Sequence, residues 1–296
     1  MPDKPPTNQG DDISGIVHSV GDNVSEFKPG DRVAAFHEMM APGGSYAEYG
    51  LSWAHTTFYL PKNTSFEEGA ALPLAAGTAA VGLYARLGLP QPWLPVPEGT
   101  KIPLVIYGAS SAVGSYAIQF AQRSNIHPLI CIAGRAQEHV KKLISPDKGD
   151  VIVDYRSGSE AVVQGIKDGL QGAPLHYAFD AVSEKGSYQN IIQVLDHEKG
   201  KITLVLPGKK YEEIPSTVEK STTTVGDLHS KLKDFGYVYF RYISKGLEEG
   251  WFKAQPQEVV PGGLEGLQTG LENLKEGRAS AVKYIFKIAD TPGVNQ

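Results

Sequence analysis

The sequence predicts an α/β fold in which a doubly wound parallel sheet is joined to a smaller, β-rich domain. Two observations carry this prediction. Between residues 103 and 206, short apolar runs alternate with helical patterns, which is typical of parallel strands covered by helices on both faces. Before residue 60, short apolar runs are instead separated by turn sequences. With 296 residues, the chain is long enough for one large domain or two.

The first part of the chain is expected to be mostly strand. Apolar runs at 13–17 and 32–36 are separated by turn residues, and a third run at 45–49 follows a Pro-Gly-Gly turn. Ser65 predicts a helix start, because a serine hydroxyl can accept a hydrogen bond from a first-turn amide. Small residues indicate a further helix over 77–87, and four prolines between 90 and 97 then require a loop.

The alternating region supplies the parallel sheet. Strands are expected at 103–107, 129–133, 151–155, 177–181 and 201–206, with helices such as 113–124 and 137–144 between them. The tail, with a helix at 263–276 and a strand at 282–288, breaks the alternation and is expected to rejoin the first domain. The predicted domains are therefore 1–76 completed by 262–296, and 77–261.

Composition narrows the classes of function. A formal charge of −5 and scattered Lys and Arg residues argue against a nucleic-acid partner. Cys131 is the single cysteine, so no disulfide framework is expected and a reducing, cytoplasmic setting is favoured. The uncharged stretch 102–122 is long enough to cross a bilayer, but its glycines and serines favour a buried strand, a turn and a buried helix.

The turn at residues 108–114 predicts a dinucleotide site. An apolar strand runs through small residues into a helix, where backbone amides can hold a pyrophosphate. The match to Gly-x-Gly-x-x-Gly is imperfect, because Ala109 and Ser111 replace two glycines and only Gly114 is kept. An ordinary tight turn is the alternative. The place of this turn, after the first strand of the alternating series, favours a Rossmann domain.

The next strand indicates which dinucleotide binds. NAD enzymes place a carboxylate at the end of this strand to bind the ribose hydroxyl. Here the strand 129–133 ends in Gly134-Arg135, and a guanidinium suits the 2′-phosphate of NADPH. NADPH is therefore predicted, although Arg135 could simply cap a surface turn and Glu138 could serve NAD instead.

Several collinear motifs resemble those of the medium-chain dehydrogenase/reductases, in particular the zinc-free, quinone-oxidoreductase-like branch close to fungal trans-enoyl reductases. The resemblance rests on the sequences at 10–17, 29–33, 44–49, 70–79 and 108–114 and on the ending from 260 to Lys283. It implies a GroES-like domain and a Rossmann domain with the active site between them. By motif, the implied NADPH contacts are Thr78, Gly108, Ser110, Ser111, Ala112, Val113, Gly114, Gly134, Arg135, Tyr155 and Leu206.

Zinc chemistry is not expected from this sequence. The zinc-dependent branch carries Gly-His-Glu where this chain has Gly10-Asp11-Asp12, and one cysteine with eight scattered histidines cannot supply a tetrahedral ligand set. The compatible reaction is hydride transfer from NADPH to an activated double bond, as in an enoyl or enone group, or to a quinone. Tyr46 is the one candidate donor to the substrate oxygen, with an ordinary core tyrosine as the alternative.

The resemblance also raises a second hypothesis. Family members carry a further stretch before the Gly-Asp-Asp motif, with strands and an Asn-Pro sequence near the nicotinamide, and this chain starts just ahead of that motif. A catalytically impaired NADPH-binding protein with a regulatory or structural role is therefore the alternative to an active reductase. For the active reductase we expect a small-molecule substrate, no membrane partner, and a polyketide synthase as a possible partner.

Overall fold

The computed structural model describes residues 8–294, and these form two compact units. One unit contains the chain up to Gly77 together with the chain from Val225 on, and the other is Thr78–Thr224. The second unit therefore ends before the predicted limit of residue 261. The physical reason is that helix α7 (Lys233–Glu249) packs against β3 (Thr57–Tyr59) and the 3₁₀ turn η1 (Ala54–Thr56) of the β-rich unit.

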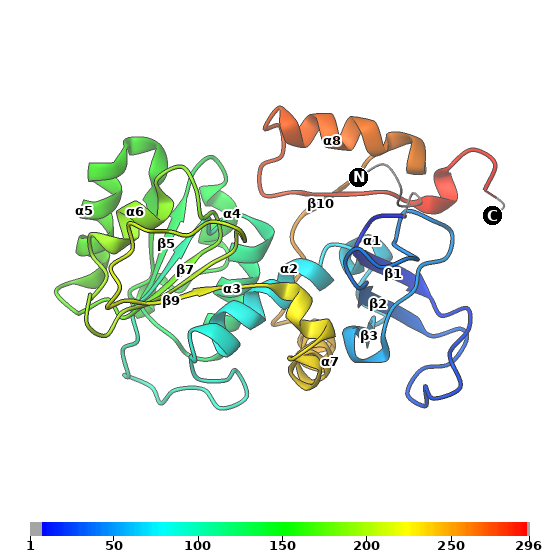
Figure 1. Ribbon diagram of the computed structural model, residues 1–296, viewed down its shortest axis with the longest axis horizontal. Helices are drawn as coiled ribbons and strands as arrows, with labels where there is room; N and C mark the ends of the chain where they lie inside the picture. Colours follow the sequence, from blue (N-terminus) through cyan, green and yellow to red (C-terminus); the bar gives the residue numbers. More distant parts are fainter. Residues whose placement is uncertain (1–7, 295–296) are drawn as a thin grey trace. The chain divides into compact units, whose positions relative to one another are not determined.

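The unit Thr78–Thr224 holds a six-stranded, all-parallel sheet in the order β6-β5-β4-β7-β8-β9. Figure 1 labels three of these strands, β5, β7 and β9. This order reverses between β4 and β7, as in the doubly wound dinucleotide-binding folds. The predicted Rossmann sheet is confirmed. Its strands are β4 (Leu104–Tyr107), β5 (Leu129–Ala133), β6 (Val151–Asp154), β7 (Tyr177–Asp180), β8 (Lys201–Leu204) and β9 (Glu219–Thr222).

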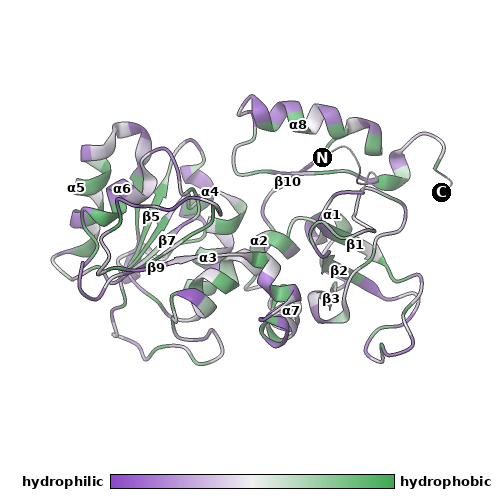
Figure 2. Cartoon of the chain, in the orientation of Figure 1, coloured by the Kyte–Doolittle hydropathy of each residue, from purple (hydrophilic) through white to green (hydrophobic). Residues whose placement is uncertain are grey.

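Helices cover both faces of this sheet. On one face, α5 (Ser159–Leu170) and α6 (Ser187–Ile192) pack their apolar side chains against Val105, Ile130 and Ile202. The other helices of the unit include α3 (Ala112–Arg123) and the short α4 (Gln137–Lys141). Burial on both sides explains why β5, Leu-Ile-Cys-Ile-Ala, is entirely apolar and is drawn in the hydrophobic colour in Figure 2.

The sequence between residues 65 and 87 forms helices, as predicted, with one irregular turn. Ser65 caps α1 (Phe66–Gly69) through a capping box with Glu68. Helix α2 (Pro73–Ala80) then continues directly into a π-helical turn, η2 (Val81–Arg86). This turn approaches β7 closely, because a Cβ on Gly82 would collide with the ring of Phe179.

The other unit is built around a three-stranded antiparallel sheet, β1-β2-β3, with β1 at Asp12–Ile16 and β2 at Arg32–Phe36. The tail adds β10 (Gln257–Val259) paired in parallel with β11 (Lys283–Ile285), the turn η6 (Gly263–Gly266) and helix α8 (Leu267–Lys275). The remaining 3₁₀ turns of the chain are η3 (Pro146–Lys148), η4 (Tyr155–Ser157), η5 (Val225–His229) and η7 (Ile288–Asp290).

The predicted strand at 45–49 is wrong. These residues form bends. The amides of Ser45 and Tyr46 donate hydrogen bonds to the carbonyls of Gly10 and Gln9 in the adjacent segment (2.9 and 3.1 Å). The preceding Gly44 lies so close to the backbone of Gln9 that any side chain would collide with it. The segment is a close backbone crossing that leaves no room for a ladder.

Candidate cofactor site and its relatives

The predicted phosphate turn lies at the carboxyl edge of the parallel sheet, between β4 and α3. Gly108 has φ of +78°, a conformation that favours glycine. The amides of Gly108 and Ala109 both donate to the carbonyl of Ile132 at the end of β5 (3.0 and 2.9 Å). The turn is therefore fixed to the neighbouring strand rather than free to move as a loop.

Packing explains why two glycines are kept in this turn. A Cβ on Gly114 would lie 2.8 Å from the Cα of Ala109 and still closer to the Gly108 carbonyl oxygen. A Cβ on Gly108 would lie 2.7 Å from a methyl group of Val182. Glycine at these positions lets the helix approach the strand closely, which is the role of the last glycine in the dinucleotide fingerprint.

Ser111 begins helix α3. Its backbone is extended (φ −69°, ψ 162°) and its hydroxyl accepts a hydrogen bond from the amide of Gly114 at 3.0 Å. The amides of Ala112 and Val113, in the same first turn, have no acceptor within the helix because of helix geometry. Such first-turn amides and the helix dipole form an anion-binding end.

Gly134 and Tyr155 meet at the end of the next strand. A Cβ on Gly134 would lie 2.5 Å from Cε1 and 2.8 Å from the hydroxyl oxygen of Tyr155, so the tyrosine ring occupies the space that a side chain would fill. Tyr155 remains 49% exposed, and the neighbouring Arg135 is exposed as well. Arg135 and Tyr155 thus follow the adjacent ends of the paired strands β5 and β6.

The acidic groups near this strand end are paired with basic ones. The Nη2 group of Arg156 donates to Oδ2 of Asp154 at 2.6 Å. Hydrogen bonds from the side chain and backbone of Arg156 lower the pKa of Asp154 to about 2. Glu138 pairs with Lys141 at 2.5 Å, on the exposed face of α4. The two carboxylates near this strand end therefore each have a basic partner.

Thr78 and Leu206, the two other predicted contacts, lie on separate elements of the same unit. Thr78 is buried in α2. Leu206 follows β8 at the carboxyl edge of the sheet, and its carbonyl accepts a hydrogen bond from the hydroxyl of Tyr211 (2.7 Å). All the predicted cofactor residues thus belong to the unit Thr78–Thr224.

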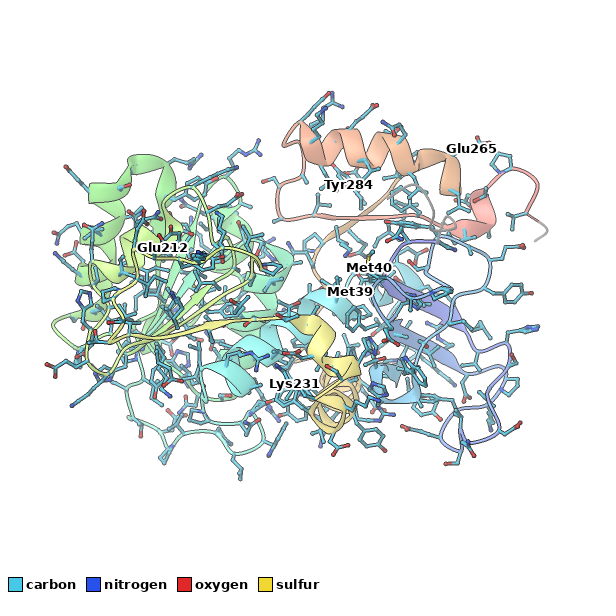
Figure 3. The ribbon with its side chains drawn as sticks, in the orientation of Figure 1. Met39, Met40, Glu212, Lys231, Glu265 and Tyr284 are labelled. Carbon is cyan, nitrogen blue, oxygen red and sulfur yellow. The ribbon has the colours of Figure 1, made fainter. Side chains whose placement is uncertain are left out.

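Tyr46 belongs to the β-rich unit, on the wall of a groove of about 890 Å³ that follows β1. Its ring meets Phe286 edge-on at 6.0 Å, and burial raises the pKa of its hydroxyl. Lys283 also lines the groove and pairs with Asp12 at 2.5 Å, and Asp12 in turn accepts from the amide of Leu74 (2.7 Å). Figure 3 labels Tyr284 on β11, the neighbour of Lys283 on the groove wall.

The described residues contain neither a cluster of metal ligands nor a membrane-spanning helix. Within 8–294, no group of three or more His, Cys, Asp or Glu side chains is placed to hold a metal ion. No helix in that range combines the length and the apolar character needed to span a membrane. Cys131 is buried in β5, and burial raises the pKa of its thiol well above the usual value.

The sequence is similar to those of known proteins. Residues 1–62 match the family model of the alcohol dehydrogenase GroES-like domain. The chain is 62% identical over 259 residues to a trans-enoyl reductase of Gibberella fujikuroi, which covers 88% of this chain and 77% of that protein. It is 31% identical over 297 residues to a trans-enoyl reductase of Alternaria alternata, covering 94% of this chain and 83% of that protein.

The chain belongs to the trans-enoyl reductases. The predicted membership of the medium-chain dehydrogenase/reductases is thereby confirmed, and the chain is an oxidoreductase of a superfamily that uses a nicotinamide cofactor. The solved quinone oxidoreductase of Coxiella burnetii shares the fold, with a TM-score of 0.72, 21% identity and coverage of 96% of this chain and 80% of that one.

Sequence reasoning did not single out two charged residues of this trans-enoyl reductase. In the sequence, Lys283 stands out only as the end of a motif, although a basic residue in an apolar strand indicates a buried partner. Asp180 falls inside the strand that the sequence predicts at 177–181. A carboxylate that ends a parallel strand at the switch point of the sheet was the available signal.

Proposed function

We propose that this trans-enoyl reductase is an NADPH-dependent, zinc-independent enzyme that transfers hydride to an activated carbon–carbon double bond of an enoyl or enone group, or to a quinone. One observation carries the proposal: the small-residue turn at 108–114 joins the first strand of a Rossmann-order sheet to the amide end of α3.

The residues present fit a dinucleotide. Gly108 and Gly114 keep side chains away from the turn, and the first-turn amides of Ala112 and Val113 would hold the pyrophosphate. Ser110, Thr78 and Leu206 would complete the contacts along the carboxyl edge. At the adenosine end, Gly134 leaves room for the ring of Tyr155.

A charge argument supports NADPH over NADH. A 2′-phosphate needs positive charge and hydrogen-bond donors, and Arg135 and Tyr155 supply both. The nearby carboxylates of Asp154 and Glu138 are each paired with a basic side chain, so neither opposes the phosphate with a full charge. The pairing of Glu138 with Lys141 also weakens the alternative in which Glu138 binds the ribose of NADH.

NADPH, when bound, would supply the hydride. The chain's own contribution is to orient the reactants, exclude water and hold a proton near the substrate oxygen. We propose Tyr46 for the last role. Burial raises the pKa of its hydroxyl, so the phenol stays protonated at neutral pH and can donate a hydrogen bond. No ligand set for zinc is proposed, since the Gly10-Asp11-Asp12 segment engages Lys283 instead.

The substrate class follows from the relatives, which are named trans-enoyl reductases. We propose a small enoyl substrate, presented either free or by a polyketide synthase, and a cytoplasmic setting in keeping with the single buried thiol.

The alternative is an NADPH-binding protein with little turnover. One observation favours it: within residues 8–294, β1 pairs only with β2, which leaves the backbone groups of its other edge without a strand partner beside the groove that holds Tyr46.

Two measurements separate these hypotheses. NADPH affinity is measured by the change in nucleotide fluorescence, and turnover by NADPH absorbance with enoyl thioesters, enones and quinones. Binding with turnover supports the reductase, whereas binding with no turnover of any acceptor supports the alternative. A protein that binds neither NADPH nor NADH would overturn both.

A further inference from the structure

A buried carboxyl group lies at the switch point of the parallel sheet. Asp180 ends β7, next to β4, and is 0% exposed. Among the described residues it forms no ion pair. Burial raises the pKa of its carboxyl, and the hydrogen bonds from Ser187, Ser183 and Val182 oppose that rise. A buried carboxylate is costly unless it is hydrogen-bonded, so these bonds account for its presence.

All three bonds come from residues that follow β7, two in the loop and one at the start of α6. One oxygen of Asp180, Oδ1, accepts from the amides of Val182 (3.0 Å) and Ser183 (2.8 Å), and Oδ2 accepts from the hydroxyl of Ser187 (2.6 Å). Ser183 and Lys185 have left-handed backbone conformations, with φ of 61° and 55°. These conformations are unfavourable for residues with a Cβ, so the loop needs such bonds to hold one shape.

The loop held by Asp180 touches the ends of both neighbouring strands. Val182 packs on Gly108 of the phosphate turn, where it occupies the place of a Cβ, and the amide of Ala181 donates to the carbonyl of Tyr107 (3.0 Å). On the other side, the hydroxyl of Ser183 accepts from the amide of Val205 (2.8 Å). The loop that Asp180 holds is therefore attached to the ends of both β4 and β8.

We propose that Asp180 is a positioning residue for the dinucleotide: by holding Val182 and Ser183 it sets the shape of the crevice between the phosphate turn and the end of β8. This inference rests on the proposed function, because it assumes that NADPH occupies that edge of the sheet. Asp180 itself is buried beneath the loop and acts through Val182 and Ser183.

A second buried carboxyl of the same unit provides a matched control. Asp150 is 3% exposed and accepts hydrogen bonds from the amides of Leu129 (2.8 Å) and Ser145 (2.9 Å) and from His127 (2.8 Å). It precedes β6 and therefore lies at the amino edge of the sheet, opposite to the proposed site. Both carboxyls hold loops, and only Asp180 lies at the cofactor edge.

The experiment compares Asp180→Ala, Asp180→Asn and Asp150→Ala for NADPH dissociation constant, KM values and melting temperature. Asp180→Ala should weaken NADPH about tenfold and raise the KM for NADPH more than that for the acceptor. Asp180→Asn should recover most of the affinity, because its Oδ1 can still accept from both amides. Asp150→Ala should lower the melting temperature and leave the NADPH affinity of the folded protein within about twofold.

Ser187→Ala is the milder variant if Asp180→Ala does not fold. It removes the bond to Oδ2 alone and should weaken NADPH about threefold. Equal NADPH affinity in wild type, Asp180→Ala and Ser187→Ala overturns the positioning role and leaves the proposed function intact. A wild-type protein that binds no NADPH overturns the proposed function and this inference together.

Discussion

Tyr155 occupies the space of the side chain that Gly134 lacks, with its Cε1 only 2.5 Å from the place of a Cβ. The two residues come from the ends of neighbouring parallel strands, β5 and β6. The sequence suggests each of them separately as a cofactor residue, but their contact makes them one structural feature: a glycine that allows a tyrosine to lie beside Arg135.

Gly134→Ala should therefore displace Tyr155 and weaken NADPH binding by about tenfold, since both a donor and its orientation are lost. Fluorescence titration with NADPH measures the effect. Gly169→Ala on α5 is the control, because its Cβ would lie 2.8 Å from Val151, the first residue of β6, at the opposite edge of the sheet. A similar loss of affinity in both variants would show that general strain, and not Tyr155, is responsible.

Arg135→Ala should weaken NADPH far more than NADH. Removing a charge-assisted bond to the 2′-phosphate costs about 1.5–3 kcal/mol, or roughly tenfold or more in affinity, while NADH has no phosphate there. The ratio of the two dissociation constants is the measurement. Lys148→Ala, which removes a surface charge at η3, should leave this ratio unchanged. Equal losses for both nucleotides would discard the role of Arg135.

Gly114→Ala tests the phosphate turn. The added methyl group would meet backbone atoms of Gly108 and Ala109, which cannot move aside like a flexible side chain. We expect destabilisation of about 1–3 kcal/mol by urea unfolding, together with loss of NADPH binding by the fraction that stays folded. Ser111→Ala should cost only about 1 kcal/mol, because it removes the cap and not the close approach. Normal NADPH binding by Gly114→Ala would contradict the proposed site.

The parts of the fold that could be predicted are those with a strong local pattern. β5 is apolar throughout because both faces are covered, and its bounds are as expected. β9, Glu-Lys-Ser-Thr, is an edge strand whose polar residues carry no such pattern, so the sequence does not predict it. The strand expected at 45–49 failed for the opposite reason: its apolar residues suit a strand, but the close crossing at Gly44 prevents a ladder.

The candidate site also has one part that a local sequence pattern predicts and another that it does not. Ser111 and Gly114 could be predicted because the fingerprint is a local spacing, and their mutual hydrogen bond is local too. The link from Asp180 through Val182 to Gly108 could not, since it joins segments far apart in the sequence and depends on the register of β4 and β7. Long-range polar contacts need the sheet order before they can be inferred.

Lys283 and Asp12 should make stability depend on pH at the alkaline end. Asp12 raises the pKa of Lys283 above its ordinary value of 10.5. The pair therefore contributes its full stabilisation below about pH 10.5, and the contribution is lost as the pH rises through the folded-state pKa. Lys283→Met should lower the free energy of unfolding by about 2 kcal/mol at pH 7, and the difference from wild type should shrink above pH 10.5. A difference in unfolding free energy that does not change with pH would contradict this role of the Lys283–Asp12 pair.

His229 should make the stability of the fold depend on pH in the acid range. Both its ring nitrogens are buried, with Phe36 at 4.8 Å and His55 at 5.5 Å between ring centroids. Burial, with His55 adding to it, lowers the pKa of His229 from 6.5 to about 4. The unfolded chain thus binds a proton at a higher pH than the folded one, so stability falls as the pH drops from 6.5 towards 4.

His229→Phe should remove part of this acid sensitivity. Urea unfolding at pH 7 and pH 4.5 measures it: we expect the wild type to lose about 2–3 kcal/mol more than the variant between these values, because each pKa unit corresponds to about 1.4 kcal/mol. His197→Gln, which changes an exposed histidine on the carbonyl of Ile192, is the control and should follow the wild type. If His229→Phe also follows the wild type, then acid unfolding arises from other groups, and the pKa of His229 is the same in the folded and unfolded chains.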